Sequence, residues 1–233
     1  AAAAANALAA TKADASTVNS LGSAVSQLGD TVSAQGQSIT AINTSIGQVG
    51  GENWIYNPSF EKQGTNGLAD GWAIAGASGV STTPSIVSSA LAAGEMAQRI
   101  DITGLSASAW SRIGNPSARR IEVNAGAPIT MSAYVRGTPG LSVRCEIQFL
   151  NSAGGAVSGP PVAANTSLTA EYARISYSVV VPQGAVRCNY FVTCYGTASI
   201  NAGFMEVDRT QIEFSSVMSG WHDNGAVNAG ALA

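Results

Sequence analysis

The chain has 233 residues, of which 11% are charged, and a formal net charge of −3. This length suits one substantial domain with an extension, and its eleven Lys and Arg residues are scattered rather than gathered into the basic stripe of a nucleic-acid-binding protein. No run reaches the roughly 18 apolar residues of a membrane-spanning helix, so we expect neither nucleic acid nor a membrane span.

Residues 1–10 are rich in alanine, and they lack both an initiating Met and a positively charged leader. They therefore do not read as a secretory signal peptide, and we expect the chain to be a fragment of a longer protein. Alanine favours helix strongly, but the phase of the apolar pattern is lost between Leu8 and Val18.

A heptad repeat of branched apolar residues runs from residue 18 to residue 49. Its a and d positions alternate in steps of three and four residues, and nine of the ten hold Val, Leu or Ile. The ten seam positions are Val18, Leu21, Val25, Leu28, Val32, Gln35, Ile39, Ile42, Ile46 and Val49. One helix alone does not bury so narrow a stripe, so the pattern predicts an α-helical coiled coil that joins several copies of the chain.

This helix would be weak in a single copy. Gly22, Gly29 and Gly36 recur at the e position, and each costs roughly 0.5–1 kcal/mol in a helix interior. A flexible Ser/Gly linker is the alternative, although a linker has no reason to keep one apolar phase. Val and Leu in the first half favour a dimer, whereas Ile39, Ile42 and Ile46 favour a trimer. We expect a homotrimer, and a dimer remains open.

The composition changes at Gly50 and Gly51, after which all Trp, Phe and Tyr residues occur. The apolar period then becomes two, with turn residues between alternating segments. The clearest segments are 129–136, 143–149, 175–181, 187–195 and 204–212.

The pattern predicts a mainly β fold: an antiparallel jelly-roll β-sandwich over residues 51–223, preceded by an N-terminal α-helical coiled-coil stalk over residues 1–50. Residues 224–233 would form a C-terminal tail.

Catalytic chemistry is not indicated. His222 is the only histidine, and neither a Gly-x-Ser-x-Gly nor a Gly-x-Gly-x-x-Gly motif is present. Cys145, Cys188 and Cys194 are odd in number and form no C-x-x-C pair, so we expect three small core residues. We therefore expect neither an enzyme nor a nucleotide cofactor.

A ligand-binding face can be predicted from strand parity. If the apolar residues of 143–149 face the core, then Glu146 and Gln148 face outward together. Aromatic rings and planar polar groups on one sheet suit a sugar, whose C–H faces stack and whose hydroxyls form hydrogen bonds. The predicted glycan-binding residues are Tyr134, Arg136, Glu146, Gln148, Tyr195 and, as a rim contact in a loop, Trp110. Contact between subunits and plain solvent exposure are the alternatives.

Several segments resemble one family. Residues 57–72, with NPSFE and a later Gly-Trp pair, resemble the first strand of jelly-roll carbohydrate-binding modules of the xylan- and glucan-binding type. Residues 129–154 resemble that family's central strand pair, 172–186 its next strand and 207–213 its closing strand. The likeness covers residues 53–222.

The resemblance implies a structural calcium ion held by Glu61, Asp208 and the Ser59 carbonyl. Calcium takes six to eight oxygen ligands, so further carbonyls and another acid, Glu95 or Asp101, would have to join. The alternative is that these carboxylates are ordinary surface groups.

A heptad stalk that leads into such a module is similar to the distal part of phage tail fibres, above all the central tail fibre, or host-specificity protein, of lambda-like siphophages. This resemblance implies a trimeric virion protein at the tail tip, assembled in the host cytoplasm with other tail-tip proteins and acting outside the cell. It implies attachment to a host cell-surface glycan or protein. A purely structural spacer of the fibre and an accessory carbohydrate-binding domain of a secreted glycan-degrading enzyme are the alternatives.

Overall fold

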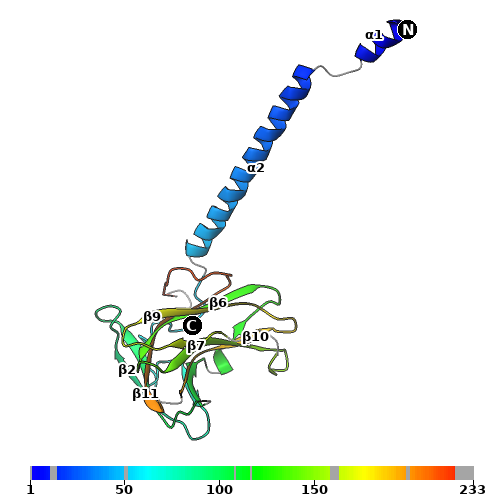
Figure 1. Cartoon of the computed structure of the whole chain (residues 1–233). Helices are drawn as coiled ribbons and strands as arrows, with labels where there is room; N and C mark the ends of the chain where they lie inside the picture. The colour runs from blue at the N-terminus through cyan, green and yellow to red at the C-terminus, as the bar shows by residue number, and fades with distance from the viewer. Residues whose placement is uncertain are drawn as a thin grey trace. The chain divides into compact units, whose positions relative to one another are not determined.

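The computed structural model describes residues 2–10, 15–49, 52–107, 109–115, 117–157, 163–197 and 200–223. Within the two helices it describes the side chains of residues 2–6 and 16–39. The chain divides into two compact units, residues 1–46 and 47–233, and Figure 1 labels both helices and several of the strands. Neither helix combines the length and the hydropathy needed to cross a membrane.

The N-terminal part of the chain is helical. Its helices are α1 (Ala2–Ala10) and α2 (Ala15–Val49). The 35 residues of α2 give it a length of about 52 Å at 1.5 Å per residue, and all ten seam positions fall within it. Asp30 is its only charged residue. Five Ser and Thr hydroxyls of α2 donate to the carbonyl four residues earlier, so part of its polar surface is satisfied within the helix.

The apolar stripe of α2 is exposed. The seam residues with described side chains and apolar character are 56–66% exposed: Val18, Leu21, Val25, Leu28, Val32 and Ile39. Apart from the helix's own backbone, a Cβ atom at Gly22, Gly29 or Gly36 would meet no atom of the described residues within 4 Å. The side chains of the later seam positions lie outside the described residues. The predicted helix is present, and no described residue of the same chain covers its stripe.

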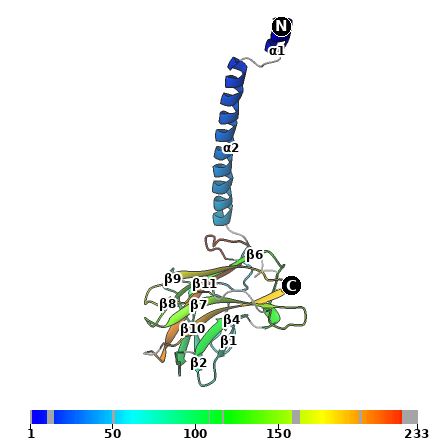
Figure 2. The ribbon, with the colours of Figure 1, turned by 45° about the vertical axis from the view of Figure 1, so that its right-hand side comes forward.

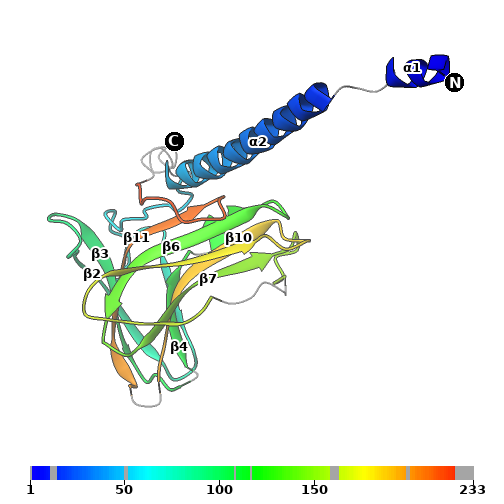
Figure 3. The same cartoon turned by 45° about the horizontal axis from the view of Figure 1, so that its top comes forward.

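The second unit is a sandwich of two antiparallel sheets, which can be followed in Figure 2 and Figure 3. The first, here called the β10 sheet, has the order β1-β4-β10-β7-β8, and β5 also pairs with β10. Its strands are β1 (Ala73–Gly76), β4 (Trp110–Gly114), β5 (Ile121–Glu122), β7 (Ser142–Leu150), β8 (Thr166–Ser167) and β10 (Arg187–Tyr195).

The second sheet, here called the β11 sheet, has the order β2-β3-β11-β6-β9. Its strands are β2 (Ser81–Ser88), β3 (Met96–Thr103), β6 (Pro128–Gly137), β9 (Ala173–Val180) and β11 (Ala202–Glu213). Consecutive strands change sheet from β6 to β7 and again from β9 to β10 and from β10 to β11. This alternation is that of a jelly roll. The predicted mainly β, antiparallel sandwich is confirmed.

The core lies between the sheets and is closed by the segment before β1. The ring of Trp72 lies 4.6 Å from that of Phe60 and 5.7 Å from that of Tyr190, and its indole N–H donates to the Asn57 carbonyl at 2.9 Å. The three cysteines are buried and unpaired, as expected of core residues. Residues 57–61 were expected in a first strand but form turns instead, because Asn57 and Phe60 adopt positive φ angles of 49° and 60°.

Candidate functional site

The outer surface of the β10 sheet carries polar and aromatic side chains from three adjacent strands. Tyr195 lies opposite Trp110, and Thr193 lies opposite both Arg112 and Arg144. Alternation along each strand directs the residues between core positions away from the core. We call this surface the open face: Trp110, Arg112, Arg144, Glu146, Gln148, Asn189, Phe191, Thr193 and Tyr195.

Glu146 lies at the centre of the polar contacts on the open face. Its Oε1 accepts hydrogen bonds from Arg144 Nε at 2.7 Å and from the Tyr195 hydroxyl. Its Oε2 accepts from Thr193 Oγ1 at 2.8 Å and lies 4.0 Å from a terminal nitrogen of Arg112. Two arginines and two hydroxyls therefore fix one carboxylate, whose side chain is 19% exposed.

These contacts shift the pKa values of Glu146 and Tyr195. Burial alone would raise the pKa of Glu146, but hydrogen bonds from Tyr195, Thr193 and Arg144 outweigh it and hold that pKa below its usual value. Burial, together with the bond to Glu146, raises the pKa of Tyr195 to about 12. At neutral pH the face therefore presents a carboxylate and a protonated phenol.

Arg112 joins the polar cluster to two aromatic rings. Its guanidinium carbon lies 3.8 Å from the centre of the Phe191 ring and 4.6 Å from that of the Trp110 ring. Phe191 lies across from Gly114, where a Cβ would overlap the phenylalanine ring. Glycine at this position therefore allows the ring to lie over β4.

An amide pair extends the open face along β7 and β10. Asn189 Nδ2 donates to Gln148 Oε1 at 3.1 Å, and the Gln148 side chain is exposed. Aromatic surface, guanidinium groups, a carboxylate and amides thus lie side by side. This set can stack on C–H surfaces and exchange hydrogen bonds with hydroxyl groups.

The structure brings together four of the six residues predicted to bind glycan: Trp110, Glu146, Gln148 and Tyr195. Trp110 begins β4 instead of lying in a loop. The prediction missed Arg112, although the alternation of 110–113 (Trp-Ser-Arg-Ile) is the signal that would have found it.

The other two residues, Tyr134 and Arg136, do not belong to this face. They lie on β6, which pairs with β11 and β9 in the β11 sheet. The prediction of one sheet carrying all these side chains was therefore wrong. Strand parity is the same whichever sheet a strand joins, and the turn after Gly137 leads from one sheet to the other.

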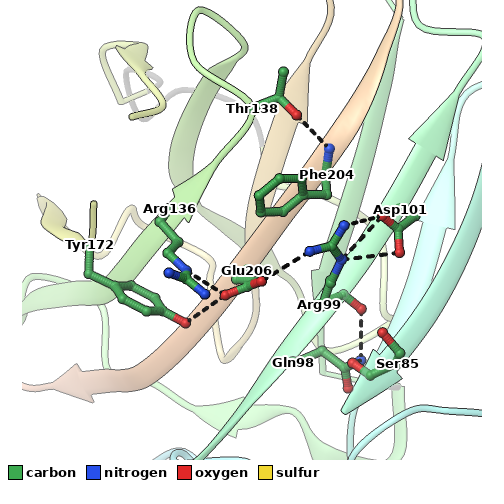
Figure 4. Close-up of polar contacts among 9 residues, drawn as sticks. All are labelled: Ser85, Gln98, Arg99, Asp101, Arg136, Thr138, Tyr172, Phe204 and Glu206. Atoms are coloured by element: carbon green, nitrogen blue, oxygen red, sulfur yellow. Dashed lines mark hydrogen bonds and ion pairs between the residues drawn. The ribbon is translucent and has the colours of Figure 1, made fainter. Parts of the chain in front are cut away.

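We call the outer surface of the β11 sheet the covered face. Its polar side chains form hydrogen bonds and ion pairs within the domain. Glu206, with a side chain only 3% exposed, accepts from Arg136 at 2.6 Å and from Arg99 at 3.3 Å (Figure 4). The Tyr172 hydroxyl lies 3.3 Å from the same carboxylate, and Arg99 stacks at 3.8 Å on Phe204. Arg136 is thus held in a structural ion-pair network.

The C-terminal segment lies over the other end of the covered face. The Ser219 carbonyl accepts from Arg174 at 2.6 Å, and its hydroxyl accepts from Gln211 at 2.8 Å. The Ser219 amide donates to Glu213 at 2.9 Å, and Thr130 donates to the Ser215 carbonyl at 2.7 Å. Thr130, Gln211 and Glu213 are fully buried as a result.

The two carboxylates predicted to bind calcium, those of Glu61 and Asp208, accept hydrogen bonds from different groups. Glu61 Oε1 accepts from the Met96 amide at 2.8 Å. Asp208 is fully buried, and its carboxylate accepts from the Ser89 hydroxyl at 2.5 Å and from the Arg209 amide at 2.6 Å. Burial raises the pKa of Asp208 to about 6.

The fit of this region to calcium is partial. Asp208 is a buried carboxylate with no ion pair among the described residues, which favours a nearby cation. Glu95 pairs with Arg209 and Asp101 with Arg99, and no group of three or more His, Cys, Asp or Glu in the described ranges is placed to hold a metal. Backbone carbonyls would have to supply most ligands, so the calcium ion stays a prediction.

No protein-family model matches the sequence, and a search of curated proteins finds no match. Solved structures do match. The enzymatically active domain of tailspike protein 4 from bacteriophage CBA120 is 17% identical, with a TM-score of 0.49 and a match covering 69% of this chain. The match covers 21% of the tailspike structure, so the chain spans about a fifth of its length.

Two carbohydrate-binding modules also match. The CBM22-1 xylan-binding domain from Paenibacillus barcinonensis Xyn10C is 17% identical, with a TM-score of 0.47, and the match covers 72% of this chain and 97% of that domain. TmCBM61, solved in complex with β-1,4-galactotriose, is 16% identical, with a TM-score of 0.44 and coverage of 70% and 99%. Likeness at this level carries no conclusion about function, which rests on the side chains of this chain.

Proposed function

We propose that this chain is a segment of a phage tail fibre that attaches to a glycan on the host cell surface. The observation that carries the proposal is the open face, where Trp110 and Tyr195 lie beside the fixed carboxylate of Glu146. Arg144, with a side chain 18% exposed, and Glu146 are both reachable from solvent. The face thus offers rings for sugar C–H surfaces and charged groups for hydroxyls.

The stalk supports attachment by several copies. The exposed apolar stripe of α2 needs partner helices, and β-branched residues at both a and d positions in its second half favour three. Linking several weak sugar sites raises the overall avidity without any new contact. In this proposal the protein is part of the virion, is assembled in the host cytoplasm with other tail-tip proteins and acts outside the cell.

Binding of the full chain to an array of bacterial lipopolysaccharide and capsule glycans tests the open face. We expect Glu146→Gln to weaken binding by roughly tenfold, since a hydrogen bond to a charged group contributes about 1.5–3 kcal/mol. Trp110→Ala removes a ring on which the sugar stacks, and Tyr195→Phe removes the hydroxyl that holds Glu146, so we expect each of them to weaken binding as well. Tyr172→Phe is the matched control, because its hydroxyl contacts Glu206 on the covered face. Equal losses in both tyrosine variants would contradict the proposal.

Sedimentation equilibrium of the full chain tests the stalk. We expect a mass of three chains, and we expect Leu28→Asp to reduce it to one chain because the variant places a charge in the apolar seam. Ser33→Asp adds the same charge outside the seam and is the control. If the parent chain is a monomer, the coiled-coil stalk is contradicted.

One observation favours a structural spacer instead. The contacts of Glu146 with Arg144, Thr193 and Tyr195 already satisfy this carboxylate within the domain. A trimer that binds no glycan on the array would support the structural spacer. A monomer that binds glycan through the open face would support an accessory domain of a secreted glycan-degrading enzyme.

A further inference from the structure

A separate pocket lies beyond the open face. It is formed by the segment before β1, by η1 (Ser117–Arg119) with β5, and by the residue after β11, and its volume is about 780 Å³. Pockets that hold small ligands span about 300–1,000 Å³. The lining residues that matter here are Trp54, Tyr56, Arg119, Arg120, Glu122 and Phe214. None of them belongs to the open face.

Two exposed aromatic rings form one wall of this pocket. Trp54 is 43% exposed and Phe214 is 37% exposed, and their ring centres lie 5.6 Å apart in an edge-to-face arrangement. The Trp54 amide donates to the Ile212 carbonyl at 3.0 Å, which holds the backbone of Trp54 beside the end of β11. Large rings held in place at the surface are typical of binding sites.

Arg119 is oriented by a tyrosine of the pocket lining. Its guanidinium lies 3.6 Å from the centre of the Tyr56 ring. The Tyr56 hydroxyl donates to Asp70 at 2.8 Å and accepts from Lys62 at 2.7 Å, so the ring beneath the guanidinium is anchored. Stacking leaves the edge of a guanidinium free to donate to a planar anion.

Positive charge exceeds negative charge among the described lining residues, and Asp70, which lies outside that lining, also acts on Arg119. Neither Arg119 nor Arg120 is part of any ion pair found among the described residues. The Arg120 Nε is buried, and the described structure offers it no hydrogen-bond partner. Glu122 is the one acidic side chain in the described lining, so the two arginines leave an excess of one positive charge.

We propose that this pocket binds a saccharide that carries a carboxylate group. The carboxylate would accept hydrogen bonds from Arg119 and Arg120, which suit planar anions. The C–H faces of the sugar ring would pack on Trp54 and Phe214. This second site is additional to the open face and does not depend on it.

Calorimetry of the full chain with trigalacturonate, and with its uncharged methyl ester, tests the carboxylate. We expect the acid to bind at least about tenfold more tightly than the ester, which keeps the sugar rings but lacks the charge. The affinity for the acid should fall as salt is added. The acid should also change the tryptophan fluorescence, and Trp54→Phe should abolish that change while keeping an aromatic wall.

Arginine variants locate the site. Arg119→Gln and Arg120→Gln should each weaken binding of the acid about tenfold, and Arg120→Lys should restore part of the loss. Arg187→Gln removes an equal charge from an exposed arginine that lies across from Glu122 but does not line the pocket, and it should weaken binding less than either of these variants. Circular dichroism of each variant shows whether the sandwich remains folded.

Three results would overturn this inference: equal affinity for acid and ester, equal losses in Arg120→Gln and Arg187→Gln, or a lower sedimentation mass for Trp54→Ala. The last result would mean that the aromatic wall packs between copies of the chain. Glu146→Gln should leave binding of trigalacturonate unchanged, so failure of this site and failure of the open face are distinguishable.

Discussion

The open face and the covered face carry the same chemistry at different exposure. On the open face Glu146 accepts from Arg144 and Tyr195, and its side chain is 19% exposed. On the covered face Glu206 accepts from Arg136 and Tyr172, and its side chain is 3% exposed. A cluster of arginine, tyrosine and carboxylate is therefore not by itself a binding site. The two clusters differ in the exposure of their carboxylates, not in that of their arginines, since Arg136 is 26% exposed and Arg144 is 18% exposed.

The largest difference between the two faces should appear in the free energy of unfolding when Glu206 or Glu146 is neutralised. Glu206→Gln leaves Arg99 and Arg136 facing each other without a buried counter-charge, and we expect a loss of about 3 kcal/mol in the free energy of unfolding. Glu146→Gln should cost about 1 kcal/mol, because solvent reaches that site. Urea denaturation measures both, and equal losses would contradict the distinction between the faces.

Removing the C-terminal segment should convert part of the covered face into an exposed one. A chain that ends at Phe214 loses the four hydrogen bonds of Ser215 and Ser219 described above, and we expect it to be about 2–4 kcal/mol less stable. Glycan binding should be retained, because the open face is untouched. Loss of glycan binding in a folded truncated chain would move the site to the covered face.

Calcium would act at Asp208, which is buried on β11, the central strand of the β11 sheet. If calcium binds as the family resemblance implies, a concentration of 100 times its dissociation constant should stabilise the chain by about 2.7 kcal/mol. Thermal unfolding in calcium and in a chelator measures this. An Asp208→Asn variant should lose the stabilisation by calcium. An identical melting temperature of the parent chain in both buffers would contradict the prediction of a structural calcium ion.

The uncovered surface of α2 gives a smaller prediction. Apart from the helix's own backbone, a methyl group at Gly29 meets no described atom within 4 Å, so Gly29→Ala should stabilise the helix by about 0.5–1 kcal/mol. Ala34→Gly should lose a similar amount and is the matched control. Thermal melts followed at 222 nm compare the two. A destabilising Gly29→Ala would mean that a partner helix packs closely at the e position.

The smallest effect should be a pH dependence of the open face. The pKa of Glu146 is lowered in the folded chain, so its contribution to stability is present above the unfolded pKa of about 4.3 and is lost as the pH falls through the folded value. The stability difference between the parent chain and Glu146→Gln should therefore shrink below about pH 4. A difference that stays constant from pH 7 to pH 3 would contradict this coupling.

The spacing of apolar residues was enough to predict the long helix and five of the strands. The heptad positions all fall within α2, and the five clearest alternating segments coincide with β6, β7, β9, β10 and β11. Shorter strands such as β4 were missed, because five residues between turn signals give too few alternations.

The candidate site depended on information that strand parity lacks. Parity correctly grouped Glu146 with Gln148 but could not show that Tyr134 belongs to the other sheet, because the side-chain period is two in both. Residues 215–219 have no periodic pattern, so nothing in the sequence showed that they lie over Thr130 and Gln211. The pocket at Trp54 joins segments far apart in the chain, and local pattern does not report such contacts.

The composition of α2 has a consequence for the conditions under which copies can associate. With Asp30 as its one ionisable side chain, the helix offers almost nothing that salt can screen or that a change of pH can titrate. Association through its Val, Leu and Ile stripe should be indifferent to both. Temperature is the remaining variable, because apolar association weakens on cooling. A stalk of this kind would hold equally well in dilute and in saline surroundings.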